Sequence, residues 1–212
     1  MRSFITDPSA IEIKSMQIVE EEMGSKKDLF TGAELAVVKR VIHTTADFEY
    51  ADLFSVSPGA VDDAVKVFAR GEAVVVSDTN MIATGINKGL LGTLNGRVEC
   101  YVAEEETRKA ALGEGLTRSM INIRRAVEKY PQAVFAIGNA PTALYELLRL
   151  AAEGKASPAL VVGVPVGFVE AAESKEALFE TTLPYIAIRG RKGGSTVAVA
   201  IINALLKLAA DE

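Results

Sequence analysis

Residues 133–142 read Ala-Val-Phe-Ala-Ile-Gly-Asn-Ala-Pro-Thr, and this stretch is the strongest indication of the fold. Its first five residues form a continuous apolar run, which is typical of a strand buried on both faces of a sheet. Glycine and asparagine then favour a turn. Pro141 stands at the first position of a helix that we expect to extend to about Glu153. A buried strand that leads through a short turn into a helix is half of a βαβ unit.

The same pattern recurs along the chain. Further buried strands are predicted at 73–77, 98–103, 159–164 and 185–189, with helical segments between them. Alternation of this kind predicts an α/β fold, namely a single doubly wound three-layer domain over residues 1–212 with a mostly parallel central sheet. A ligand of such a sheet is expected beyond the carboxyl ends of the strands.

Composition excludes several classes of protein. The chain has 212 residues, of which 49% are apolar, and its net charge is −5. A globular protein is therefore expected, and an interaction with nucleic acid is not. The N-terminus lacks the apolar segment of a signal peptide, and the longest apolar runs are interrupted by Gly, Pro or Asn or are too short to cross a bilayer. We expect a cytoplasmic protein that does not contact membranes.

Cysteine and histidine are each present once, as Cys100 and His43. One cysteine excludes an intrachain disulfide and a thiolate cluster, and one histidine excludes a metal site built from several histidines.

A basic, glycine-rich turn follows the last predicted strand. Residues 189–195 read Arg-Gly-Arg-Lys-Gly-Gly-Ser, and Ser195 is expected to open the closing helix. Free N–H groups at a helix start favour an anion, and the neighbouring Arg and Lys side chains add positive charge. We interpret the turn as a cradle for a phosphate or carboxylate, although a tight turn with solvated basic residues is the alternative. No G-x-x-x-x-G-K-[ST] motif is present, which excludes a P-loop NTPase.

His43 is the natural carrier of acid–base chemistry near neutral pH. Arg40 lies three residues earlier on the same predicted helix, so the two side chains are expected to share a face. An exposed polar stripe is the alternative. Ser15, within a predicted helix, and Arg118 and Ser119, at a predicted helix start, are weaker candidates.

Seven segments of the chain form a distinctive set, namely 10–15, 40–43, 117–119, 136–144, 163–169, 171–175 and 189–195. The three most specific strings within them are Gly-Asn-Ala-Pro-Thr-Ala-Leu, Pro-Val-Gly-Phe-Val and Arg-Gly-Arg-Lys-Gly-Gly-Ser. Together these segments resemble the precorrin-8X methylmutase family, including its cobalt-precorrin variants, and the resemblance runs nearly from end to end.

The resemblance implies an isomerase of corrin biosynthesis that moves a methyl group of a tetrapyrrole from C-11 to C-12. The product is hydrogenobyrinic acid, or cobyrinic acid if the ring already holds cobalt. The resemblance also implies a compact α/β homodimer that needs no redox cofactor and no protein-bound metal. His43 matches the family's proton donor and acceptor, and Ser15 and Arg40 match its substrate-contacting serine and arginine.

Acetate and propionate side chains make the substrate a polyanion, which suits a rim of glycine turns, helix starts and arginines. The residues expected to contact it are Ser15, Arg40, Arg118, Ser119, Asn139, Arg189, Gly190, Arg191, Gly193, Gly194 and Ser195. The chain departs from the family pattern after His43, where Thr-Thr-Ala-Asp stands in place of small residues and glycine.

Two alternatives remain, and the first belongs to a different class of protein. One is a non-catalytic carrier of an anionic tetrapyrrole, which would keep the basic turn and have no need of His43. The other is a mutase or lyase that acts on a different polyanionic small molecule. The sequence leaves open whether the natural substrate contains cobalt and whether the site is shared across a dimer.

Overall fold

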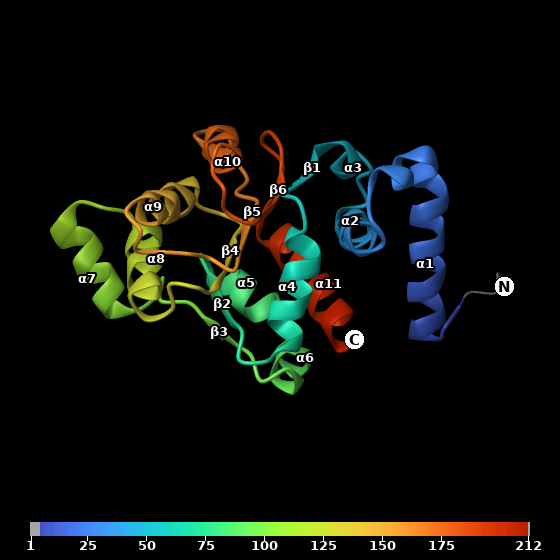
Figure 1. Ribbon diagram of the computed structural model, residues 1–212, viewed down its shortest axis with the longest axis horizontal. Coiled ribbons are helices and arrows are strands. Elements are labelled where there is room, and N and C mark those ends of the chain that lie inside the picture. Colours follow the sequence, from blue (N-terminus) through green and yellow to red (C-terminus); the bar gives the residue numbers. More distant parts are fainter. Residues whose placement is uncertain (1–4, 212) are drawn as a thin grey trace.

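The computed structural model describes residues 5–211 (Figure 1), so residues 1–4 and 212 of the predicted domain lie outside it. Within the described chain one six-stranded sheet has the order β1-β6-β5-β4-β2-β3. Five strands pair in parallel, and β1 pairs with β6 in the antiparallel direction. The strands are β1 (Phe54–Val56), β2 (Val74–Ser77), β3 (Arg97–Glu99), β4 (Val134–Ile137), β5 (Leu160–Gly163) and β6 (Tyr185–Ile188). The predicted α/β fold with a mostly parallel sheet is confirmed.

Helices fill the connections and cover both faces of this sheet (Figure 1). They are α1 (Pro8–Met23), η1 (Gly24–Leu29), α2 (Gly32–Thr45), α3 (Tyr50–Leu53), α4 (Ala60–Ala69), α5 (Asn80–Gly85), α6 (Lys88–Thr93), α7 (Glu105–Glu114), α8 (Arg118–Lys129), α9 (Pro141–Ala152), α10 (Ala171–Phe179) and α11 (Ser195–Ala210). No described helix combines the length and hydrophobicity needed to cross a bilayer.

The sheet separates two hydrophobic cores, and β4 contributes to both. Val134 and Ala136 belong to the core shared with α4 and α11, whereas Phe135 and Ile137 belong to the core shared with α8 and α9. Successive side chains of a strand point to opposite faces, so a strand between two cores must be apolar throughout. This is why the run at 133–137 identified the fold.

Helix α11 is the central helix of one face, and it packs against α2, α4 and α5. Helix α2 lies on α11 rather than on the sheet, and α1 packs on α2, which places α1 at the outer edge of the molecule (Figure 1). The buried residues of α1 are Val19 and Met23, both in its C-terminal half.

The sequence pattern does not indicate β1. Ser57-Pro58 has the composition of a helix start, but helix α4 begins only at Ala60, after Gly59, whose φ is 75°. Instead Ser57 donates its N–H to the Tyr185 carbonyl at 3.1 Å and accepts the Tyr185 N–H at its Oγ at 2.9 Å. Ser57 thus continues the pairing with β6, and this long-range contact overrides the local Ser-Pro helix signal.

Candidate functional site

The chain reverses direction across the sheet at β2, because β3 lies on one side of β2 and β4 on the other. Ligands of doubly wound sheets bind in the crevice at such a switch point. Here Asp78 occupies it. The fully buried Asp78 carboxylate accepts backbone N–H groups of Gly138 at 3.1 Å, Asn139 at 2.9 Å and Ala140 at 2.7 Å. Burial raises the pKa of Asp78, and these three donors oppose that rise. The amides before α9 are therefore already bonded to a carboxylate of the protein.

The carboxyl ends of β2, β4, β5 and β6 lie at this edge of the sheet, because these neighbouring strands are parallel. The turn after β6 rests on the segment after β5, since the Gly194 N–H donates to the Val164 carbonyl at 2.8 Å. A Cβ at Gly193, whose φ is 148°, would lie 2.2 Å from that same carbonyl oxygen, so only glycine fits there. The side-chain hydroxyls of Ser195 and Thr79 lie 3.2 Å apart and link α11 to the end of β2.

The N-terminus of α11 is open to an anion. Its N-cap is Gly194, which has no side chain to accept the first N–H groups of the helix. Unbonded N–H groups at a helix start form an anion site. Ser195, as predicted, is the first residue of this helix.

The basic side chains of the turn do not converge on one point. The Arg189 guanidinium lies 4.5 Å from the centre of the Phe179 ring and 3.9 Å from a Glu176 carboxylate oxygen. It therefore points toward α10. Arg191 is exposed, and its guanidinium lies 5.6 Å from the centre of the exposed Phe168 ring.

Lys192 is neutralised by the segment that follows α2. Its Nζ donates to Asp47 at 2.5 Å and to Glu49 at 2.7 Å, and these hydrogen bonds raise the pKa of Lys192. Arg191, by contrast, forms no ion pair with a carboxylate of residues 5–211. Of the three basic residues, Arg191 is the one left to attract an incoming anion.

His43 and Ser15 line the same pocket of about 250 Å³, which lies between α1 and α2. His43 is exposed near the C-terminal end of α2, and Ser15 lies half-buried on α1. Ala46, the C-cap of α2, also lines the pocket and has a φ of 53°. Ala46 thus has a left-handed backbone conformation of the kind that glycine adopts most readily.

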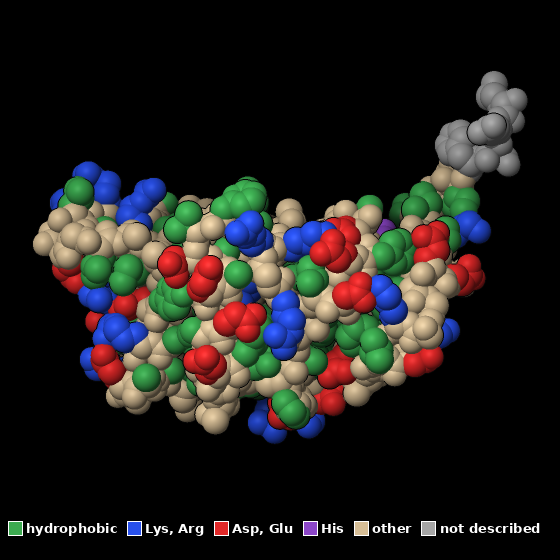
Figure 2. Space-filling model, turned by 90° about the horizontal axis from the view of Figure 1, so that it is seen from above, with side chains coloured by type: hydrophobic (Ala, Val, Ile, Leu, Met, Phe, Trp, Pro, Cys, Tyr) green, Lys and Arg blue, Asp and Glu red, His purple; other side chains and the backbone are tan. Residues whose placement is uncertain are grey.

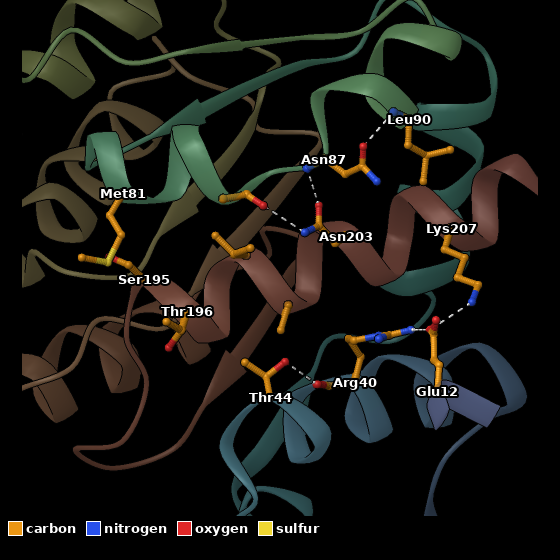
Figure 3. A pocket seen from close by; sticks show the side chains of 13 residues that line it. Glu12, Arg40, Thr44, Met81, Asn87, Leu90, Ser195, Thr196, Asn203 and Lys207 are labelled. Carbon is orange, nitrogen blue, oxygen red and sulfur yellow. Dashed lines mark hydrogen bonds and ion pairs between the residues drawn. The ribbon is translucent and has the colours of Figure 1, made fainter. Parts of the chain in front are cut away.

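Arg40 and Ser195 line a second and larger pocket, of about 540 Å³ (Figure 3). The Arg40 guanidinium donates to Glu12 of α1 at 2.5 Å. Although they are three residues apart on α2, Arg40 and His43 line different pockets. The partner of Arg40 comes from α1, which packs against α2, and the sequence of α2 alone does not reveal it.

Arg118, Ser119 and Asn139 lie elsewhere on the molecule. Arg118 is exposed at the first position of α8, which covers the opposite face of the sheet from α2 and α11, and half-buried Ser119 follows it. Asn139 is exposed in the turn before α9. Ser15 and His43 thus line one pocket, and Arg40 and Ser195 line another. Arg118, Ser119 and Asn139 line neither of these two pockets.

Charges of both signs are interspersed over the face drawn in Figure 2, which shows no broad basic surface. Local positive groups must therefore select an anionic ligand. Two further charged residues line the larger pocket, Glu12 and Lys207, and neither is among the residues expected from the sequence. A signal for Glu12 existed, because it lies one helical turn before Ser15 within the same family segment.

The comparisons with known proteins agree with one another. A model of the precorrin-8X methylmutase family matches residues 10–208. A cobalt-precorrin-8 methylmutase from Priestia megaterium is 43% identical over 95% of this chain and 88% of its own length. One from Salmonella typhimurium is 42% identical over 96% of both chains. A solved precorrin-8X methylmutase from Thermus thermophilus superimposes with a TM-score of 0.86 at 41% identity, over 95% of this chain and 98% of that one.

Proposed function

This chain belongs to the precorrin-8X methylmutase family, whose members are isomerases, and we propose that it moves a tetrapyrrole methyl group from C-11 to C-12. The substrate is precorrin-8X or cobalt-precorrin-8, and the product is hydrogenobyrinic or cobyrinic acid. The relatives are named as methylmutases, and they match this chain over nearly its whole length. Both facts disfavour the alternative of a non-catalytic tetrapyrrole carrier.

The observation that carries the proposal is the pairing of His43 with Ser15 at one pocket. His43 is the single histidine of the chain, and its exposed ring is accessible to a ligand. A suprafacial 1,5-shift leaves the composition of the substrate unchanged. His43 donates a proton to the conjugated ring, the methyl group migrates with its bonding electrons, and His43 then accepts the proton back. Ser15 is placed to hydrogen-bond the same ligand.

Restraint of the macrocycle is the second requirement, because the migrating and accepting carbons must be held on one face of the ring. The protein can hold the substrate through its carboxylate side chains. The open N-terminus of α11, exposed Arg191 and pocket-lining Arg40 are the groups that suit them. We propose the exposed Arg118 and Asn139 as further contacts.

We also propose that the protein acts as a homodimer in the cytoplasm. The dimer rests on the family resemblance. The location rests on a composition with one cysteine, which fits a reducing compartment.

The test is an absorption titration with hydrogenobyrinic acid and with cobyrinic acid, run on the wild type and on His43→Ala, beside turnover of precorrin-8X. We expect a spectral shift on binding to the wild type. We expect His43→Ala to keep its circular dichroism spectrum and to lose turnover. Normal turnover by His43→Ala would remove the proton role, and the absence of corrin binding by the wild type would refute the proposed function.

A further inference from the structure

Three helices meet through one carboxylate in the larger pocket. Glu12 of α1 accepts from Arg40 of α2 at 2.5 Å and from Lys207 of α11 at 3.3 Å (Figure 3). Among the described residues that line this pocket, Glu12 carries the one carboxylate. Two cations thus share a single anion that the protein itself provides.

These ion pairs are open to solvent. The side chains of Glu12, Arg40 and Lys207 are 43%, 25% and 60% exposed. Exposed pairs contribute little to stability, so a ligand carboxylate can replace one of the partners at small cost. The buried residues of α1 lie in the other half of the helix, at Val19 and Met23, so the segment around Glu12 is held weakly.

The rest of the pocket suits a carboxylate-bearing ligand. Ser195 and Thr196 line it at the open N-terminus of α11, and the side chains of Asn87 and Asn203 line it nearer to Lys207 (Figure 3). The hydroxyls and the helix start attract an anion at one end, and Arg40 and Lys207 attract one at the other. Within this arrangement the Glu12 carboxylate occupies the position, between Arg40 and Lys207, that a ligand carboxylate would take.

We propose that Glu12 is a resident carboxylate that occupies Arg40 and Lys207 in the unliganded protein and yields them to a carboxylate side chain of the tetrapyrrole. The identity of the ligand rests on the proposed function. The hydrogen bond and charge of Arg40, and then those of Lys207, lower the pKa of Glu12. Glu12 is therefore ionised over the working pH range and competes with the ligand at full charge. The exchange keeps both cations oriented until substrate arrives and selects ligands that carry more than one carboxylate.

The test compares Glu12→Gln with the wild type, using two probes. One probe is hydrogenobyrinic acid, and the other is benzenehexacarboxylate, a flat polycarboxylate that is not a tetrapyrrole. We expect Glu12→Gln to bind each probe about three- to tenfold more tightly, because Arg40 and Lys207 no longer have a competing anion. The gain should shrink when Arg40→Met is added. Glu21→Gln, an equal charge change at an exposed position of α1, is the control for long-range electrostatics and should change affinity little.

Unchanged or weaker binding of both probes by folded Glu12→Gln would overturn the proposal, since Glu12 would then be orienting Arg40 rather than competing with the ligand. An equal gain in the Arg40→Met background would overturn it as well. If the wild type binds benzenehexacarboxylate and not the corrin, the proposed function fails, and the comparison of Glu12→Gln with the wild type on benzenehexacarboxylate still decides whether Glu12 is exchanged.

Discussion

The ammonium group of Lys175 donates a hydrogen bond of 2.9 Å to the backbone carbonyl of Lys192, and the Lys175 side chain is fully buried. Lys175 lies on α10, and Lys192 lies in the turn that leads to the open start of α11. Within residues 5–211 Lys175 forms no ion pair. A buried cation thus holds the backbone of the turn through a hydrogen bond. The Lys192 side chain itself forms ion pairs with Asp47 and Glu49.

Burial lowers the pKa of Lys175 to about 8 from its usual 10.5. Below pH 8 the folded and unfolded chains both carry the proton, and the cost of burying the charge is present in full. Between pH 8 and 10.5 the folded chain loses the proton while the unfolded chain keeps it. We therefore expect the free energy of unfolding of the wild type to rise relative to Lys175→Met, with a slope approaching about 1.4 kcal/mol per pH unit.

Urea unfolding of both proteins at pH 7, 8, 9 and 10 measures this difference. Lys88→Met, which removes an exposed lysine of α6, is the control and should leave the pH profile of the wild type unchanged. A constant difference between wild type and Lys175→Met would show that Lys175 does not titrate in this window.

Arg191 and Lys192 should affect ligand binding differently. Lys192 is neutralised by Asp47 and Glu49, whereas Arg191 is exposed. Screening weakens attraction between exposed charges most. Arg191→Met is therefore expected to weaken binding of hydrogenobyrinic acid and to reduce its salt dependence. Lys192→Met should alter the salt dependence less. Titrations at 50 and 300 mM NaCl compare the two, and equal effects would mean that Lys192 also attracts the ligand.

Gly193→Ala should disrupt the turn. The added Cβ would lie 2.2 Å from the Val164 carbonyl oxygen, at a φ of 148° that L-residues rarely adopt. We expect a loss of about 2–4 kcal/mol in the free energy of unfolding and weaker corrin binding. In the matched control Gly113→Ala, on α7, the new methyl group meets nothing within 4 Å, and helix propensity should stabilise the protein by about 0.5–1 kcal/mol. Equal melting temperatures for the two variants would contradict the clash.

Asp78→Asn should destabilise the switch point. The carboxylate accepts three backbone N–H groups with its two oxygens, whereas an amide offers one acceptor oxygen and turns N–H donors toward other donors. We expect a loss of about 2–4 kcal/mol, measured by urea unfolding. Asp62→Asn, at an exposed site in the first turn of α4, should cost less than about 1 kcal/mol. A similarly small loss at Asp78 would show that its three hydrogen bonds contribute little.

Ala46→Gly should stabilise the C-terminal end of α2. Ala46 has a φ of 53° and a ψ of 32°, a left-handed conformation that glycine adopts without steric cost. We expect a gain of about 0.5–1 kcal/mol in the free energy of unfolding. Ala36→Gly, in the interior of α2, should lose about 1 kcal/mol and serves as the comparison. A loss at Ala46 would mean that backbone strain there is small.

The layered α/β fold follows from the sequence alone, because a strand between two cores must be apolar at every position, as at 133–137. The sequence also indicates the glycine turn and the start of α11 at Ser195. Both depend on local backbone conformation, which restricts the residue types that a turn or a helix start accepts. Tertiary structure alone decided the placement of β1 and the pairing of Ser57 with Tyr185. Those contacts join residues more than 120 positions apart, and no local propensity encodes them.

The direction of charged side chains was likewise decided in three dimensions. Periodicity placed Arg40 and His43 on one face of α2, but Glu12 of α1 draws Arg40 into one pocket while His43 lines another. Lys192 was equally unpredictable as a partner of Asp47 and Glu49. A long charged side chain can pair with any opposite charge that the fold places within its reach. The sequence therefore specifies which charged groups exist, and the tertiary structure specifies which of them form pairs.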